Sequence, residues 1–409
     1  MFEGKAWQWD ELRKEYYLHL FAVKQPDLNM DNPLVREEVK KIMRFWLAQG
    51  VDGFREDVIT FISKKDGLPN DYIMPASRGI RHYNHGPRVH DYLREFQRDA
   101  LDGYDAFTIG EAPLVAPEKA LDYIDERRGQ LDTMIQFQCM NADCFLIDYA
   151  VLPFSARRLK SAFDEWQEQL DGRAWNMLYL ENHDHPRVIS RYGSEKYRVE
   201  SGKMLACSYL FQKGTPFVYQ GQEIGMTNWR PEKASDYEDV QTRWHYEHML
   251  PFLPEKIRLA WCRRASRDSA RTPMQWSAEA NAGFTSGTPW FHVNDNYRTV
   301  NVAAQEDDPD SLLSFYRDAI AILKRLRVIR DGDYVDHKKW SGSLFVYSRT
   351  LGDEKVLVIC SFVERPVHFK APRGFDLSKG ELLLKNYGAE LFKNGFTTKP
   401  YECRVYHFA

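Results

Sequence analysis

The sequence predicts an α/β protein in which strands and helices alternate, followed by a smaller antiparallel β domain. Short apolar runs of strand length recur between longer stretches with helical spacing. These runs lie at 51–54, 106–109, 133–137, 176–180 and 216–219. Each run is followed by polar residues, for example "RED" at 55–57 and "ENHDH" at 181–185. After about residue 330 the spacing changes to alternating, strand-like runs such as "SLFVYSRTL", which is typical of antiparallel sheets.

The clearest single element is a helix between Asn32 and Gly50. Asn32 is a preferred N-cap residue, Pro33 suits the first helical turn, and Gly50 is placed to end the helix. Apolar residues repeat at helical spacing, so we expect one face of the helix to be buried. That face consists of Val35, Val39, Ile42 and Trp46.

The succession of strands and helices favours a (β/α)8 TIM barrel. Further helical stretches lie at 155–170, 200–213 and 311–330. No GxGxxG follows any strand, so the doubly wound alternative has no support. The polar stretch 63–87 is long and rich in Gly, Pro and Asn, which predicts a loop that covers a substrate, with a disordered insert as the alternative.

Composition excludes several classes of partner. The chain has 56 Lys and Arg against 59 Asp and Glu, a net charge of −3, and no basic cluster that would bind nucleic acid or an anionic membrane. No apolar run reaches the roughly 20 residues that span a bilayer, and the first residues do not resemble a signal peptide. The six cysteines lack CxxC spacing. We therefore expect a cytoplasmic protein with reduced thiols.

Charged residues gather where the predicted strands end. Arg55 and Asp57 are two residues apart and face the same way on a strand, whereas Glu56 faces the opposite way. Glu111 ends the next strand, and Asp184 with His183 ends a later one. Because like charges raise one another's pKa values, such a cluster suits glycoside hydrolysis with retention, which needs one ionised and one protonated carboxyl group.

Several motifs resemble the α-amylase family of glycoside hydrolases, family 13, in its oligo-1,6-glucosidase and α-glucosidase branch. They occur in order along nearly the whole chain. They are "QPDLN" (25–29), "GVDGFRED" (50–57), "IGEA" (109–112), "ENHDHP" (181–186), "KGTPFVYQGQEIGMTN" (213–228) and "ARTPMQW" (270–276). The resemblance implies a retaining, exo-acting α-glucosidase that acts on short oligosaccharides such as isomaltose.

The same resemblance implies a role for each matching residue. Asp57 would be the nucleophile, Glu111 the general acid/base, and Asp184 the third carboxylate, which grips sugar hydroxyls. Four residues would bind or position the substrate. Arg55 would hold Asp57, and His183 would form hydrogen bonds with sugar hydroxyls. Arg271 would contact the non-reducing end, and Val58 would correlate with a preference for α-1,6 bonds. No metal or other cofactor is expected, because the calcium-binding loop of many members would precede residue 1.

Three features depart from the family pattern. Glu56 stands where Met or Leu is common, and we expect a surface or helix-side ion pair there. His185 stands where Gln is frequent and could alter the +1 subsite. The chain opens inside the family's B-domain loop, so the first three strand–helix units would be missing, and we expect a fragment or misassigned start with poor solubility or oligomers in isolation. The expected domains are a B-domain remnant over 1–32, the barrel over 33–330 and a β-sandwich over 331–409.

Other functions compete with this interpretation. His183 and His185 form an HxH pair that could bind a catalytic metal, although no other strand end supplies histidines. A binding subunit would need no carboxylates, yet all three are present. An inactive truncated family member stays an alternative, because loss of the first strands could abolish activity even with the carboxylates in place. Trehalose-6-phosphate hydrolase is the closest sibling activity, and a basic cluster in the long loop could bind its phosphate. That cluster consists of Lys64, Lys65, Arg78 and Arg81.

Overall fold

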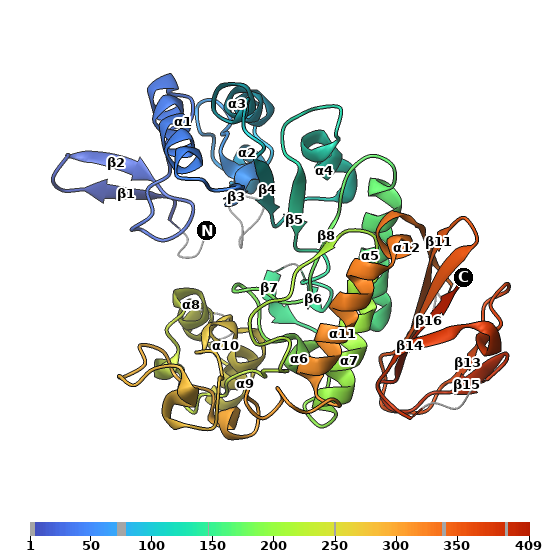
Figure 1. The fold of residues 1–409 in the computed structure, drawn as a ribbon. Coiled ribbons are helices and arrows are strands. Elements are labelled where there is room, and N and C mark those ends of the chain that lie inside the picture. Colours follow the sequence, from blue (N-terminus) through green and yellow to red (C-terminus); the bar gives the residue numbers. More distant parts are fainter. Residues whose placement is uncertain (1–4, 72–78, 146, 249–250, 338–340, 389–391) are drawn as a thin grey trace. The chain divides into compact units, whose positions relative to one another are not determined.

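The chain folds into two compact units, each with its own core. The computed structural model describes residues 5–71, 79–145, 147–248, 251–337, 341–388 and 392–409 (Figure 1). Unit 1 comprises residues 1–138 and 169–177, and unit 2 comprises residues 139–168 and 178–409. None of the described helices combines the length and the apolar character that a membrane crossing requires.

Unit 1 contains a hairpin, a parallel sheet and the helices beside it. Its strands are β1 Trp7–Asp10, β2 Glu15–Leu18, β3 Gly53–Glu56, β4 Phe107–Ala112 and β5 Thr133–Gln136. Its helices are α1 Pro33–Ala48, a 3-10 turn Ile59–Phe61, α2 Ile80–Tyr83, α3 Val89–Phe96, which continues as a π-helical turn Gln97–Leu101, and α4 Pro117–Ile124.

The strands β3, β4 and β5 form a parallel sheet in chain order, as the alternating pattern predicts. β3 begins two residues later than expected, because its pairing with β4 starts at Gly53 opposite Phe107. A Cβ atom at Gly53 would lie 1.9 Å from the Phe107 carbonyl oxygen, so only glycine permits this approach. The shift carries Arg55 into the strand and leaves Asp57 immediately after its end.

Helix α1 begins as predicted but buries a different face. The Asn32 side chain accepts a hydrogen bond from the Leu34 N–H, and Pro33 occupies the first turn. Ile42 and Trp46 remain 58% and 48% exposed, so the prediction of their burial is wrong. The buried residues are Lys40, Met43 and Leu47, with Val35 and Val39 partly covered.

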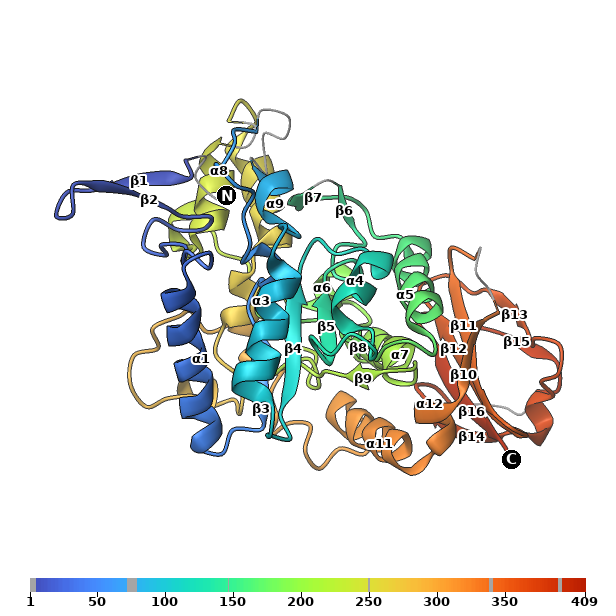
Figure 2. The same ribbon diagram turned by 90° about the horizontal axis from the view of Figure 1, so that it is seen from above.

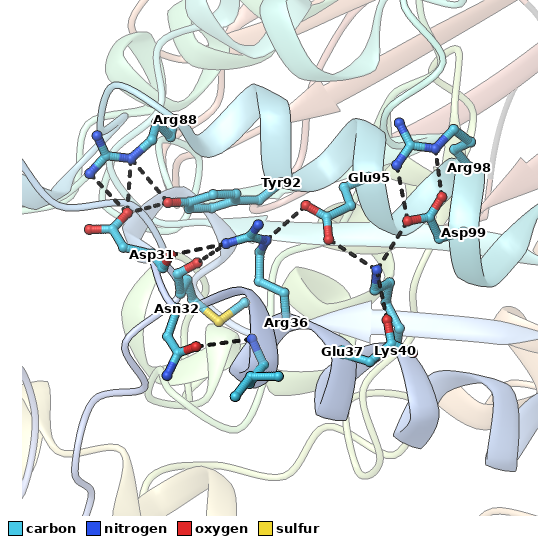
Figure 3. Close-up of polar contacts among 12 residues, drawn as sticks. Asp31, Asn32, Arg36, Glu37, Lys40, Arg88, Tyr92, Glu95, Arg98 and Asp99 are labelled. Atoms are coloured by element: carbon cyan, nitrogen blue, oxygen red, sulfur yellow. Dashed lines mark hydrogen bonds and ion pairs between the residues drawn. The ribbon is translucent and has the colours of Figure 1, made fainter.

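The buried face of α1 differs because ion pairs join α1 to α3 (Figure 3). Arg36 Nε donates to Glu95 at 2.8 Å, and Lys40 Nζ lies 3.0 Å from both Glu95 and Asp99. Burial lowers the pKa of Lys40, but its hydrogen bonds to carboxylates outweigh that effect and raise the pKa. The spacing of apolar residues alone therefore does not predict a buried helix face that also contains charged residues with partners on another helix.

Unit 2 contains the remaining elements, apart from residues 169–170 at the end of its first helix and Met177, which fall in unit 1. Its strands are β6 Cys144–Phe145, β7 Ile147–Val151, β8 Met177–Leu178, β9 Thr215–Pro216, β10 Asp333–Asp336, β11 Leu344–Leu351, β12 Glu354–Ser361, β13 His368–Lys370, β14 Glu381–Lys385, β15 Gly395–Thr397 and β16 Cys403–Phe408. Its helices are α5 Ala156–Leu170, α6 Val188–Arg191, α7 Arg198–Leu210, α8 Val240–His248, α9 Glu255–Ala265, α10 Asp268–Arg271, α11 Leu312–Arg325 and α12 Arg327–Asp331. Short 3-10 turns lie at 234–236, 280–283, 295–298 and 377–379.

The C-terminal strands form the antiparallel sheet that the sequence predicts. Its order is β10-β11-β12-β16-β14, and every neighbouring pair is antiparallel. One face packs on α5, α7 and α11 through a shared core that includes Phe163, Leu210 and Tyr347 (Figures 1 and 2). The other face packs on the small sheet β13–β15 through Phe369 and Phe396. The C-terminal sheet therefore belongs to the same core as the helices before it.

Two of the predicted strands are shorter than expected. The runs 176–180 and 216–219 form only the two-residue strands β8 and β9, which pair with each other. The backbone hydrogen bond from the Phe217 N–H to the Leu178 carbonyl continues that pairing at 2.8 Å. The residues after Leu178 leave the ladder and carry the "ENHDH" motif.

Removing Lys40 should destabilise unit 1. We expect Lys40→Ala to lower the free energy of unfolding by about 1–3 kcal/mol, because two half-buried carboxylates lose a charged partner. The urea midpoint measures this change. Lys41→Ala is the matched control, since Lys41 pairs with Glu38 on the exposed side of α1 and should change the midpoint little. Equal midpoints for the two variants would contradict the proposed role of the α1–α3 ion pairs.

Candidate functional site

In unit 1, Arg55 joins two carboxylates at the carboxyl ends of parallel strands. Its guanidinium is hydrogen-bonded to Asp57 and lies 2.5 Å from Glu111 Oε1. Arg55 and Asp57 share a face, as the spacing predicts, and β4 places Glu111 beside them. The carboxyl ends of strands are where parallel α/β proteins bind ligands.

The two carboxylates differ in exposure. The Asp57 side chain is 70% exposed, whereas the Glu111 side chain is 4% exposed. Burial raises the pKa of Glu111 to about 7, the positive charge of Arg55 opposes that rise, and the nearby Asp57 carboxylate adds to it. The pair therefore combines an accessible acidic group with a buried neighbour that can carry a proton near neutral pH.

The backbone after β3 also holds Glu111. The Val58 N–H donates to Glu111 Oε2 at 3.2 Å, and Val58 adopts a left-handed conformation with φ 38°. This conformation is strained for a β-branched residue. Gly110 leaves room for the side chains that follow this turn, because a Cβ atom there would lie 2.9 Å from the Ile59 side chain and 2.6 Å from that of Leu131. The Val58 side chain packs against a small cluster that includes Leu20 and Phe61.

Glu56 does not form the ion pair that we expected. Among the described residues no basic side chain pairs with it, and its Oε2 is buried without a hydrogen-bond partner. Burial, followed by the nearby Asp132 carboxylate, raises the pKa of Glu56 to about 7. The prediction of an ion pair is therefore wrong, because β3 carries Glu56 toward the packed side of the sheet, opposite Gly110.

In unit 2, a second group of charges surrounds Asp184. Its Oδ1 accepts hydrogen bonds from Arg267 at 3.0 Å and from Arg271 at 2.9 Å, and its Oδ2 lies 3.2 Å from His183 Nε2. Arg271 also donates to the His183 carbonyl at 2.9 Å. The structure thus brings together His183, Asp184 and Arg271, three of the residues that the sequence singled out.

A buried ion pair anchors the segment that carries Asp184. Arg187 Nη1 lies 2.6 Å from Glu181 Oε1, and both side chains are fully buried. Arg187 also donates to the carbonyls of Gln220, Ser269 and Ala270. The motifs at 181–186, 213–228 and 270–276, which are far apart in sequence, therefore meet around one guanidinium.

His185 is more deeply buried than its sequence neighbours His183 and Asp184. It is buried, and its Nδ1 is 2.8 Å from Asn182 Oδ1. Within the described ranges, no three side chains of His, Cys, Asp or Glu gather into a group that could hold a metal ion. The effect of His185 on a +1 subsite stays a prediction.

Two further residues of this region, Arg267 and Asp239, are not predicted by any sequence motif. Arg267 joins Asp184 to the buried carboxylate of Asp239. Arg267 lies four residues before Arg271 in a basic stretch, which was the only signal available. Asp239 lies in a polar segment outside the motifs named above, and only the tertiary structure brings it to Arg267.

Comparisons with known proteins agree over nearly the whole chain. The family model for the α-amylase catalytic domain matches residues 1–332. The oligo-1,6-glucosidase of Parageobacillus thermoglucosidasius is 43% identical over 417 residues, covering 99% of this chain and 74% of that protein. Among solved structures, Bacillus licheniformis trehalose-6-phosphate hydrolase aligns with a TM-score of 0.91 at 39% identity. Isomaltulose synthase from Klebsiella sp. LX3 aligns with a TM-score of 0.94 at 33% identity. Both structural alignments cover 99% of this chain and 74% of the other.

Replacing Glu56 should stabilise the protein only at higher pH. The pKa of Glu56 is about 7 in the folded protein and about 4.5 in the unfolded chain. Its ionisation therefore lowers the stability of the folded state as the pH rises above 4.5, and the effect is complete above pH 7. We expect Glu56→Gln to raise the free energy of unfolding by at most about 3 kcal/mol at pH 8 and to change it little at pH 4.5. Thermal melting at both values measures the difference. Glu38→Gln, at an exposed site on α1, is the control, and a gain that is equal at both pH values would contradict the assignment.

Proposed function

The chain belongs to the α-amylase family, and on this premise we propose that it is a retaining, exo-acting α-glucosidase. It hydrolyses terminal α-1,6-glucosidic bonds of short oligosaccharides such as isomaltose, in preference to α-1,4 bonds. The observation that carries the proposal is the pairing of exposed Asp57 with buried Glu111 through Arg55. An ionised nucleophile beside a carboxyl group that can be protonated is what double displacement requires.

The parallel strands of unit 1 support the proposed architecture. We propose that the parallel strands β3, β4 and β5 are strands of a (β/α)8 barrel. On this proposal, residues 1–32 belong to the B-domain insertion and the barrel runs to about residue 330. The carboxylates at the ends of β3 and β4 then stand where barrel enzymes place their chemistry.

In the first chemical step, the Asp57 carboxylate attacks the anomeric carbon. Glu111 gives its proton to the glycosidic oxygen as that bond breaks, and the sugar remains bound to Asp57 as an ester. Arg55 holds the Asp57 carboxylate in position for this attack through a charge-assisted hydrogen bond.

In the second step, Glu111 acts as the base. Ester formation removes the negative charge of Asp57, which had raised the pKa of Glu111, so that pKa falls and Glu111 stays ionised. Glu111 then takes a proton from water as the water oxygen attacks the anomeric carbon, which frees glucose and Asp57. The same two residues therefore serve both steps.

Asp184, His183 and Arg271 are proposed to bind the glucose. Asp184 is the third carboxylate, which grips hydroxyls and stabilises the positively charged transition state. His183 bonds a hydroxyl, and Arg271 meets the non-reducing end. Their mutual hydrogen bonds support a preformed arrangement. Val58 is proposed to influence linkage preference, and its strained backbone next to Glu111 supports an effect on the site.

Trehalose-6-phosphate hydrolysis is the alternative, and the charges of the long loop weigh against it. Lys64 is paired with Asp27, and Arg81 with Asp71 at 2.7 Å, so both cations already have carboxylate partners. Arg78 lies outside the described residues. Among the described cations of that cluster, only Lys65 therefore lacks an ion pair, which is weak support for a phosphate site.

The substrate experiment compares isomaltose, maltose and trehalose 6-phosphate. We expect kcat/KM for isomaltose to exceed the other two by about tenfold or more, since one pocket contact that differs is worth roughly 1–3 kcal/mol. Faster turnover of trehalose 6-phosphate would favour the alternative. No turnover of any of the three would support an inactive family member.

Substitutions at the two carboxylates should separate their roles. We expect Asp57→Asn to lower kcat by about 10⁴-fold or more for every substrate, because no ester can form. Glu111→Gln should lower kcat for isomaltose strongly but spare the first step with an aryl glucoside whose leaving group needs no proton. Stopped-flow release of the aryl group shows this as a burst. Residual Asp57→Asn activity within tenfold of wild type would refute the nucleophile.

The pH dependence of kcat/KM should report Glu111. Activity should fall above about pH 7, because the general acid loses its proton there. Arg55→Met should move this basic limb to higher pH, since losing a nearby positive charge disfavours ionised Glu111, while also lowering maximal activity. Profiles on variants that melt like the wild type test this prediction. A basic limb that moves to lower pH would contradict the Arg55–Glu111 coupling.

A further inference from the structure

Arg267 lies between two carboxylates in unit 2. Its Nη1 donates to Asp184 Oδ1 at 3.0 Å, and its Nε donates to Asp239 Oδ1 at 2.8 Å. A planar guanidinium bonded at two edges has little freedom to turn. Arg267 therefore restricts the orientation of the Asp184 carboxylate.

Asp239 is itself rigidly placed. It is buried, and its Oδ2 accepts hydrogen bonds from the Thr242 N–H at 2.8 Å and from the Thr242 hydroxyl at 2.7 Å. Burial raises the pKa of Asp239, but Arg267 and Thr242 outweigh that effect and keep the pKa below its ordinary value. The backbone N–H of Asp239 is bonded in turn to Asp268 Oδ2 at 3.1 Å.

The other arginine on Asp184 is held differently. Arg271 is bonded to Asp184 and to the backbone carbonyl of His183, and its side chain is more exposed than that of Arg267. Arg271 thus keeps a larger exposed part for contact with a ligand. The Arg267 guanidinium instead spans two carboxylates, one of them buried, and suits orientation of Asp184 rather than contact with the sugar.

We propose that Arg267, anchored by Asp239, is a positioning residue that sets the orientation of Asp184 for transition-state stabilisation. This inference rests on the proposed function, in which Asp184 is the third carboxylate. Asp239 holds Arg267, Arg267 holds Asp184, and Asp184 meets the developing positive charge on the sugar. A misplaced carboxylate would still bind glucose but would stabilise that charge less.

The test uses the full chain with Arg267→Lys and Arg267→Met, and Asp239→Asn as the variant that loosens the anchor. We expect both Arg267 variants to lower kcat by about 10- to 100-fold with a small change in KM. Asp239→Asn should act in the same direction with a smaller loss. Affinity for a cationic glucose analogue should fall in parallel with kcat, whereas affinity for glucose should change about twofold or less.

A control and a double substitution separate positioning from general stability. Arg264→Met is the control, because Arg264 lies on the neighbouring helix α9 and donates to the Leu152 carbonyl, and it should keep wild-type kcat. In an Asp184→Asn background, Arg267→Met should weaken binding of the cationic analogue no further. An equal additional loss in that background would overturn the inference. So would a wild-type kcat in the Arg267 variants.

The outcomes also distinguish this inference from the function on which it rests. Wild-type turnover of isomaltose with unaffected Arg267 variants overturns the inference alone. No wild-type turnover of any α-glucoside overturns the proposed function and this inference with it. Variants that lose kcat, keep glucose affinity and melt within a few degrees of wild type support both.

Discussion

The carboxylates proposed for catalysis depend on arginines that each bind two acidic groups. Arg55 joins Asp57 to Glu111, and Arg267 joins Asp184 to the buried Asp239. Without a cation, neighbouring carboxylates would raise one another's pKa values and turn toward water. A guanidinium opposes both effects, because its planar donors offset part of the charge and set the angle of each oxygen. The placement of the arginines therefore decides what the carboxylates can do.

Differences in burial then give similar groups different chemistry. Asp57 lies after the end of β3, where its carboxylate reaches solvent, whereas Glu111 lies within β4 and is covered. The same arginine contacts both, so contact with a cation does not explain their difference. Burial does, because it raises the pKa of Glu111 enough to hold a proton near neutral pH. The strained turn at Val58 contributes one further donor to that buried side chain.

Charged residues also organise parts of the fold that apolar patterns describe poorly. Helix α1 packs through Lys40 and its carboxylate partners as well as through Met43 and Leu47, which leaves Trp46 largely exposed. Glu56 shows the opposite case, since a carboxyl group lies on the packed side of β3 without a described basic partner. In both cases the polar or charged character of the side chain alone predicts its environment wrongly, because the neighbouring element decides whether its charge is compensated.

The sequence by itself determined the alternation of strands and helices, the cap of α1, the antiparallel C-terminal strands and the gathering of charges at strand ends. These features follow from local periodicity, from turn and cap chemistry, and from motifs that keep their order along the chain. Only the tertiary structure decided which face of α1 is buried, how short β8 and β9 are, that Glu56 lacks an ion pair, and that Asp239 reaches Arg267. Each of these depends on contacts between residues far apart in sequence, and no local pattern encodes the distance between two such side chains.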